Sequence, residues 1–259
     1  MNYFVSENSV VRKVWGKADT ILFIFAGSAA EFALNKAVDW LYFTGKLPAD
    51  PLGRLFSTVA YAQKIVFSTL EDAHRAIDQI TAIHKQVEGA RGMQIPDWAY
   101  RDVLFMLIDY SIRSYELLEA KLTEAEKAEL FTTFYKVGVR MGLKGLPEDY
   151  DAWVIMRGDH LQQNLHNSSF TNDLFKQYKY HLGPVRYWLL IRVQAWLVPP
   201  RVRRLLCLNA GAVLRPVLYT YKLSRKIGLQ RALRNVLLPA KYKVLIEGLD
   251  KGEISAPSA

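Results

Sequence analysis

Signals that begin α-helices recur along this chain, and they constrain its fold more than any other feature of the sequence. Asp50 precedes Pro51, so an N-cap residue is followed by the residue preferred in the first helical turn. Ser68 and Glu71 have the spacing of a capping box. Further helix starts stand near Pro96, at 122–126 and at Pro147. No alternation of apolar and polar residues of useful length occurs. The sequence therefore predicts an all-α fold.

These signals also predict where the helices lie. The stretch 15–41 contains no proline and is apolar on most faces, so we expect one long buried helix there. A loop at 44–49 and the cap at Asp50 predict a helix over 51–67. The Ser68 capping box predicts the next helix over 69–88, ended by Gly89. Beyond His181, shorter helices are expected between Pro184, Pro199, Pro200, Pro216 and Pro239.

The composition is that of one large ordered domain. The chain has 259 residues, of which 51% are hydrophobic, and one cysteine, Cys207. This length suits a single domain over 1–249 followed by a flexible tail at 250–259. A lone cysteine excludes an internal disulfide, a thiolate zinc cage and a cysteine-bound iron–sulfur cluster. A metal would have to be held by histidine, by carboxylates or within a non-covalently bound prosthetic group.

The charge is concentrated in the C-terminal third. Between Leu174 and Ile246 stand 15 Lys and Arg and no Asp or Glu, and the rest of the chain is acidic. This asymmetry indicates contact with phosphate of nucleic acid or of an anionic lipid surface, or a cytosolic flank of a membrane-touching region, and the charge alone leaves these open. Our hypothesis is peripheral contact of 186–243 with an anionic membrane. Nucleic acid is the weaker option, because no nucleic-acid-binding signature is present. The apolar uncharged run 20–30 is too short to span a bilayer, and the start lacks a secretory pattern, so we expect a cytoplasmic protein.

His84 is the histidine most clearly placed on an apolar helix stripe. Ala73, Ile77, Ile80 and Val87 share that stripe with it at steps of three or four residues. One interpretation is a neutral core imidazole hydrogen-bonded to a carbonyl. The other is an axial metal ligand, because haem iron needs only one protein imidazole.

The remaining histidines fit no metal site by spacing. Glu71 and His74 form one Glu-x-x-His pair, whereas a di-iron bundle needs two. His160 and His166 are six residues apart, on opposite faces of a helix. Neither they nor His181 has an assigned role, although His160 shares a stripe with Trp153, Met156 and Gln163.

Arg54 and Thr58 are four residues apart and project from one helix face. Both side chains would reach the same ligand. An inward arginine needs a carboxylate, and either a haem propionate or an acidic side chain of the protein would serve. The spacing leaves both possibilities open.

Two segments carry a resemblance to a known family. DPLGRLFST at 50–58, followed by IHKQVEG at 83–89, resembles the core of the latex-clearing protein (rubber oxygenase) and MpaB-type oxygenase family. The segment FAGSA at 25–29 and the segment LPEDYDAW at 146–153 support it. The resemblance covers roughly residues 12 to 208 in outline, and its specific motifs are the Arg-x-x-x-Thr pair and the histidine motif.

The resemblance implies a globin-like helical core that holds haem b and oxidatively cleaves carbon–carbon double bonds of isoprenoid substrates. His84 would be the proximal iron ligand, and Arg54 and Thr58 would support the haem pocket. Glu31 is the candidate for the family's catalytic glutamate, with a helix-surface acid as its alternative. Ser57 stands where rubber oxygenase has a lysine that caps the distal iron, so that closure is not expected here.

The sequence thus predicts a haem b-dependent oxygenase that acts with dioxygen on a hydrophobic isoprenoid or lipid-like substrate. Its alternative is a non-catalytic helical protein that binds lipid or a membrane surface. In that alternative, Arg54 and His84 would be a structural polar pair.

Overall fold

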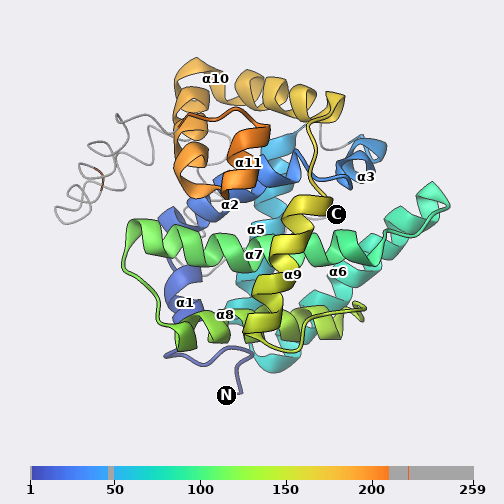
Figure 1. Cartoon of the computed structure of the whole chain (residues 1–259). Coiled ribbons are helices and arrows are strands. Elements are labelled where there is room, and N and C mark those ends of the chain that lie inside the picture. The colour runs from blue at the N-terminus through green and yellow to red at the C-terminus, as the bar shows by residue number, and fades with distance from the viewer. Residues whose placement is uncertain (1, 46–49, 210–220, 222–259) are drawn as a thin grey trace.

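The regular structure of the described residues is helical, which confirms the all-α prediction. A computed structural model describes residues 2–45, 50–209 and 221 (Figure 1). Apart from two isolated bridges, these residues form one all-α domain. Its helices are α1 (Val10–Trp15), α2 (Ala18–Phe32), α3 (Val38–Phe43), α5 (Pro51–Phe67), α6 (Leu70–Arg91), α7 (Asp97–Leu118), α8 (Glu124–Arg140), α9 (Tyr150–Gln163), α10 (Ser169–Leu197) and α11 (Pro200–Leu205).

Several helix starts lie where the sequence places them. The Asp50 carboxylate accepts a hydrogen bond from the Gly53 backbone N–H, 3.0 Å away, and so caps α5. Thr123 caps α8 in a capping box with Glu126. The Asp149 carboxylate caps α9. These caps satisfy N–H groups of the first turn that have no partner within the helix.

The expected single helix over 15–41 is wrong, because two breaks divide it into α1, α2 and α3. Gly16 ends α1. Asn35 lies between α2 and α3, and its side-chain oxygen accepts a hydrogen bond from the Ala37 N–H at 2.8 Å. Its amide also donates to Asp102 on α7 at 2.7 Å. Asparagine that bonds its own neighbouring backbone competes with the helix, and a tertiary partner favours the break.

The cap of α6 lies one residue later than predicted. Thr69, not Ser68, accepts the hydrogen bond from the Asp72 N–H, whereas Ser68 still donates its own N–H to Lys64 and ends α5. Gly89 does not end α6, which continues to Arg91. Gly92 ends it instead with φ of +68°, a left-handed conformation that glycine adopts readily.

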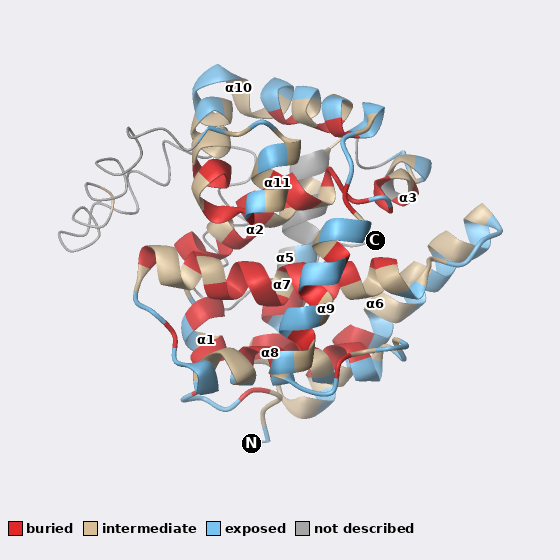
Figure 2. Ribbon diagram, viewed as in Figure 1, coloured by how far each residue is buried: buried red, intermediate tan, exposed pale blue. Residues whose placement is uncertain are grey.

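Helices α2 and α7 pack against each other along the centre of the domain. Figure 1 shows α7 crossing the middle, with α8 below it, α9 in front of it and α10 above. The central helices are mainly buried, whereas the far end of α6 and the outer side of α10 are exposed (Figure 2). None of the described helices is long and apolar enough to cross a membrane.

Helix α10 bends where the sequence predicts a break. Gly183 has φ of +73° and Pro184 follows it, so the helix changes direction between two arms. Pro200 begins α11, as expected after the break at Pro199. Pro216, Pro239 and the tail 250–259 lie outside the described residues.

Candidate functional site

His84 lies on the outer half of α6 and is half-buried. Its Nδ1 is 2.9 Å from the backbone carbonyl oxygen of Ile80, one turn earlier. The buried face of α6 is formed by Ala73, Ala76 and Ile77, nearer the start of the helix. The side chain is therefore at the edge of the core rather than in its centre.

The Ile80 carbonyl decides the tautomer of a neutral His84 imidazole. A carbonyl oxygen only accepts hydrogen bonds, so Nδ1 carries the proton and donates it. Nε2 then carries the lone pair. A metal-binding histidine in proteins typically has this arrangement, with one ring nitrogen donating to an acceptor and the other facing the metal.

The His84 ring is also held from the side of α7. The Tyr100 ring meets it edge to face at a centroid distance of 5.2 Å and an interplanar angle of 77°. The Tyr100 hydroxyl donates to Glu88 at 3.1 Å, and Glu88 also accepts from the Ile95 N–H at 2.9 Å. Burial, together with the Glu88 charge, raises the pKa of Tyr100. A neutral, hydrogen-bonded tyrosine thus keeps the orientation of the imidazole.

Arg54 and Thr58 lie on α5, which packs against α6. Thr58 is exposed. The side chain of Arg54 is outside the described part of the structure, so its predicted ligand stays a prediction. What the described residues establish is that both predicted pocket residues stand on the helix next to the one that carries His84.

Glu31 lies in the middle of the domain, with an exposed fraction of 1%. Both of its carboxylate oxygens accept hydrogen bonds from Arg157, at 2.6 and 2.7 Å. The Tyr110 hydroxyl donates a third bond to Glu31 at 2.9 Å. Glu31 is therefore not the helix-surface acid of the alternative interpretation, and its catalytic role stays a prediction.

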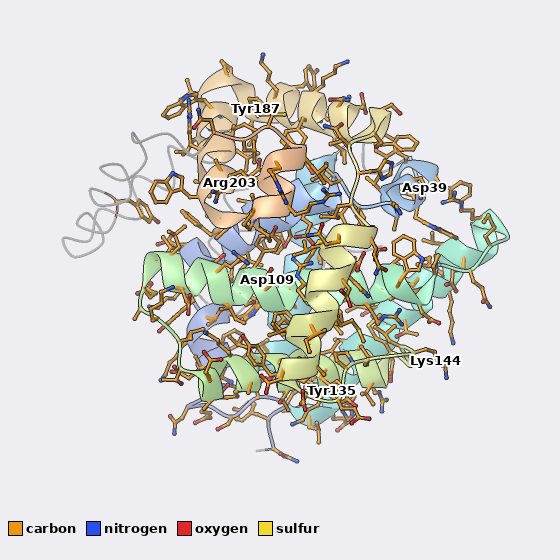
Figure 3. All side chains as sticks on the ribbon, in the orientation of Figure 1. Asp39, Asp109, Tyr135, Lys144, Tyr187 and Arg203 are labelled. Carbon is orange, nitrogen blue, oxygen red and sulfur yellow. The ribbon has the colours of Figure 1, made fainter. Side chains whose placement is uncertain are left out.

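Arg157 joins three helices, because it also bonds Asp109 of α7 at 3.0 and 3.2 Å. Asp109 lies where α9 crosses α7 (Figure 3). Burial raises the pKa of Asp109, but the positive charges of Arg157 and Arg113 outweigh it, so the pKa is lowered. Burial likewise opposes the charge of Arg157, and Glu31 with Asp109 raises its pKa overall. Asp109 and Arg157 are therefore both charged at neutral pH.

A second buried polar cluster surrounds Asp102 of α7. One of its oxygens bonds Nδ1 of His160, and the other accepts from Asn35 at 2.7 Å and from Asn164 at 2.9 Å. His160 also packs against the Phe105 ring, with the ring centroids 5.2 Å apart. The imidazole thus ties α9 to α7, a structural role that the sequence did not assign to it.

Sequence reasoning missed Arg157, Asp102 and Asp109. A signal was present: the two aspartates are seven residues apart within the apolar stripe of α7, and Arg157 is four residues after the buried Trp153. Such charged residues on a buried face need partners. Which partners they find depends on how α2, α7 and α9 cross.

The described residues form an all-α fold with a charged core, and His84 stands at the edge of that core with its Nδ1 bonded to a backbone carbonyl. The family model described as ER-bound oxygenase mpaB/B'/Rubber oxygenase, catalytic domain, matches residues 12–223. The chain belongs to this family, as its motifs suggested. No curated protein and no solved structure matches it.

Proposed function

We propose that this oxygenase-family protein binds haem b through His84 and uses dioxygen to oxidise or cleave a hydrophobic isoprenoid or lipid-like substrate. Membership of the family supports the oxygenase role. The single observation that carries the haem proposal is the hydrogen bond between His84 Nδ1 and the Ile80 carbonyl at 2.9 Å. In a neutral imidazole with Nδ1 protonated, Nε2 is the nitrogen that would bind the iron.

The donor set at His84 fits a haem better than a bare metal ion. Among the described residues, no group of three histidine, cysteine or acidic side chains is placed to hold a metal ion. A porphyrin supplies four ligands itself and needs only one protein imidazole. When bound, the haem would supply the dioxygen chemistry, and the chain would supply orientation and an apolar environment.

The side chains have separate proposed tasks. Tyr100 and the Ile80 carbonyl keep the His84 ring in one orientation. Arg54 would pair with a propionate, and Thr58 would support the same pocket from α5. Catalytic use of Glu31 would require its carboxylate to leave Arg157, since both oxygens are engaged. We therefore assign Glu31 to proton transfer only with a rearrangement of that pair.

The location of the protein is part of the proposal. We place it in the cytoplasm, with peripheral contact between 186–243 and an anionic membrane where hydrophobic substrates partition. In the described part of this region, Trp188 is 46% exposed and stands near Arg192. Salt-sensitive flotation with acidic liposomes tests this contact, and its absence at low ionic strength would remove it.

Visible absorption spectroscopy tests the haem proposal directly. Protein from a host supplied with ample porphyrin precursor should show a Soret band, and His84→Ala should lose most of it because the iron loses its protein ligand. His74→Ala is the matched control, since His74 lies on the same helix and contacts Phe4. It should keep the band.

Two results would decide against the proposal. A folded, colourless wild-type protein that also fails to take up added haemin would favour the alternative, a non-catalytic lipid-binding protein. An unchanged Soret band in His84→Ala would assign the iron to another ligand. Helical circular dichroism of each variant separates loss of the ligand from loss of the fold.

A further inference from the structure

The bend of α10 encloses a groove that shares no residue with α5, α6 or α7. Its volume is about 640 Å³, within the range of small-molecule sites. The first arm of α10, the second arm and the segment 206–209 form its three walls. Tyr187, on the second arm, stands at the top of the molecule (Figure 3). The groove therefore owes its shape to the turn at Gly183 and Pro184.

The lining of the groove is mixed: aromatic and aliphatic side chains stand beside two cations, and Asn167, Thr171, Asn172 and Asn209 add uncharged polar groups. Phe175 stands on the first arm, and Tyr187, Trp188 and Ile191 stand on the second. Lys179 and Arg192 add one positive charge from each arm. Phe175 and Lys179 are four residues apart, as are Trp188 and Arg192, so each arm turns an aromatic ring and a cation to the same side.

Arg192 is held in place without an acidic partner among the described residues. Its Nη1 donates to the backbone carbonyl of Asn209 at 3.2 Å, and its guanidinium lies 5.5 Å from the centre of the Trp188 ring. No described carboxylate forms an ion pair with Arg192 or with Lys179. The sequence from Leu174 to Ile246 contains no acid that would neutralise them.

From this geometry we propose that the groove binds a single-chain anionic amphiphile, with its carboxylate or phosphate between Lys179 and Arg192 and its chain along Phe175, Tyr187 and Ile191. Two cations that face an apolar wall attract a ligand that carries both a negative head and an apolar tail. Because no groove residue belongs to the His84 site, this proposal is independent of haem binding.

Bromine quenching of tryptophan fluorescence tests the site. The probe is 11-bromoundecanoate, and 11-bromoundecan-1-ol is its uncharged counterpart. The acid should quench the full-length protein saturably and bind more tightly than the alcohol, with the advantage falling as salt is raised. Trp188→Phe should lose most of the quenching amplitude, because Trp188 lines the groove.

Charge-removing variants locate the head group. Lys179→Gln should raise the dissociation constant of the acid about three- to fivefold, and Lys179→Gln with Arg192→Gln about tenfold or more. Neither should change binding of the alcohol. Lys176→Gln is the matched control: it removes an exposed charge from the same arm outside the groove, and should leave both constants unchanged.

Three outcomes would overturn the proposal. The first is equal affinity for the acid and the alcohol. The second is that Lys176→Gln weakens binding of the acid as much as Lys179→Gln does. The third is that Trp188→Phe keeps the full quenching amplitude. A further binding experiment uses phosphatidylcholine vesicles with and without phosphatidylglycerol. Vesicle binding that needs Lys179, without binding of the soluble acid, would assign the cations to a membrane head group and reject the free ligand. The Soret band does not enter any of these readouts.

Discussion

At the scale of single residues, the charged core depends on Arg157. It occupies both oxygens of Glu31 and one oxygen of Asp109, and its side chain is 6% exposed. Removing one member of a buried ion pair leaves the other charges without compensation. The interaction is therefore costly to break, even though burying it offers little net stability.

We expect Arg157→Met to lower the free energy of unfolding by about 3–5 kcal/mol, because Glu31 and Asp109 would lose their shared partner in a buried site. Urea unfolding measures this decrease in the free energy of unfolding. Arg140→Met is the control: Arg140 makes a comparable two-bond pair with Asp78, but on the surface. Water replaces that interaction, so the urea midpoint should hardly move. If both variants shifted the urea midpoint equally, burial would not be the reason that the Arg157 pair is costly to break.

At the scale of helices, α2 approaches α7 closely at one glycine. A Cβ atom on Gly27 would lie 2.2 Å from the Tyr110 ring and 3.0 Å from Leu197. Tyr110 cannot turn away without losing its hydrogen bond to Glu31. The small residue is therefore required for the contact between these two central helices.

Gly27→Ala should lower the free energy of unfolding by about 1–3 kcal/mol, because the added methyl group overfills the contact between α2 and α7. Gly158→Ala in α9 is the opposite case. No atom lies within 4 Å of a Cβ placed there, so better helix propensity should add about 0.5–1 kcal/mol. Thermal and urea unfolding measure the decrease in stability expected for Gly27→Ala and the increase expected for Gly158→Ala. Stabilisation by both changes would indicate that helix propensity, not the contact with Tyr110, decides the effect at Gly27.

At the scale of the whole molecule, buried carboxylates link stability to pH. The pKa of Asp109 is lowered from its ordinary value of 3.8: burial raises it, but Arg157 and Arg113 lower it more. A carboxylate with a lowered pKa in the folded state contributes stability above its unfolded pKa. That contribution is lost as the pH falls through the folded value.

The free energy of unfolding should therefore decline as the pH is lowered below about 4. Asp109→Asn should be less stable than the wild type at pH 7 and should decline less steeply in acid, because one linked proton is removed. Urea titrations from pH 7 to pH 3 compare the two slopes. Identical slopes would mean that the pKa of Asp109 does not differ between the folded and the unfolded protein.

Local sequence determined the helical class and most helix starts of this protein, because a cap needs only residues within one turn of each other. Asp50, Thr123 and Asp149 therefore lie where their side chains predict. The histidine motif and the Arg54–Thr58 spacing indicated the family, since each is a short pattern on one helix. Their ligand roles stay predictions.

Tertiary structure alone decided the break at Asn35, the partners of Glu31 and the groove of α10. Asn35 and Glu31 are bonded by residues 67 and 126 positions away. The groove needs both arms of a bent helix and the segment 206–209. Side chains that meet across such separations are brought together by helix packing. Helix packing depends on the shape of the whole core and leaves no periodic trace in one segment.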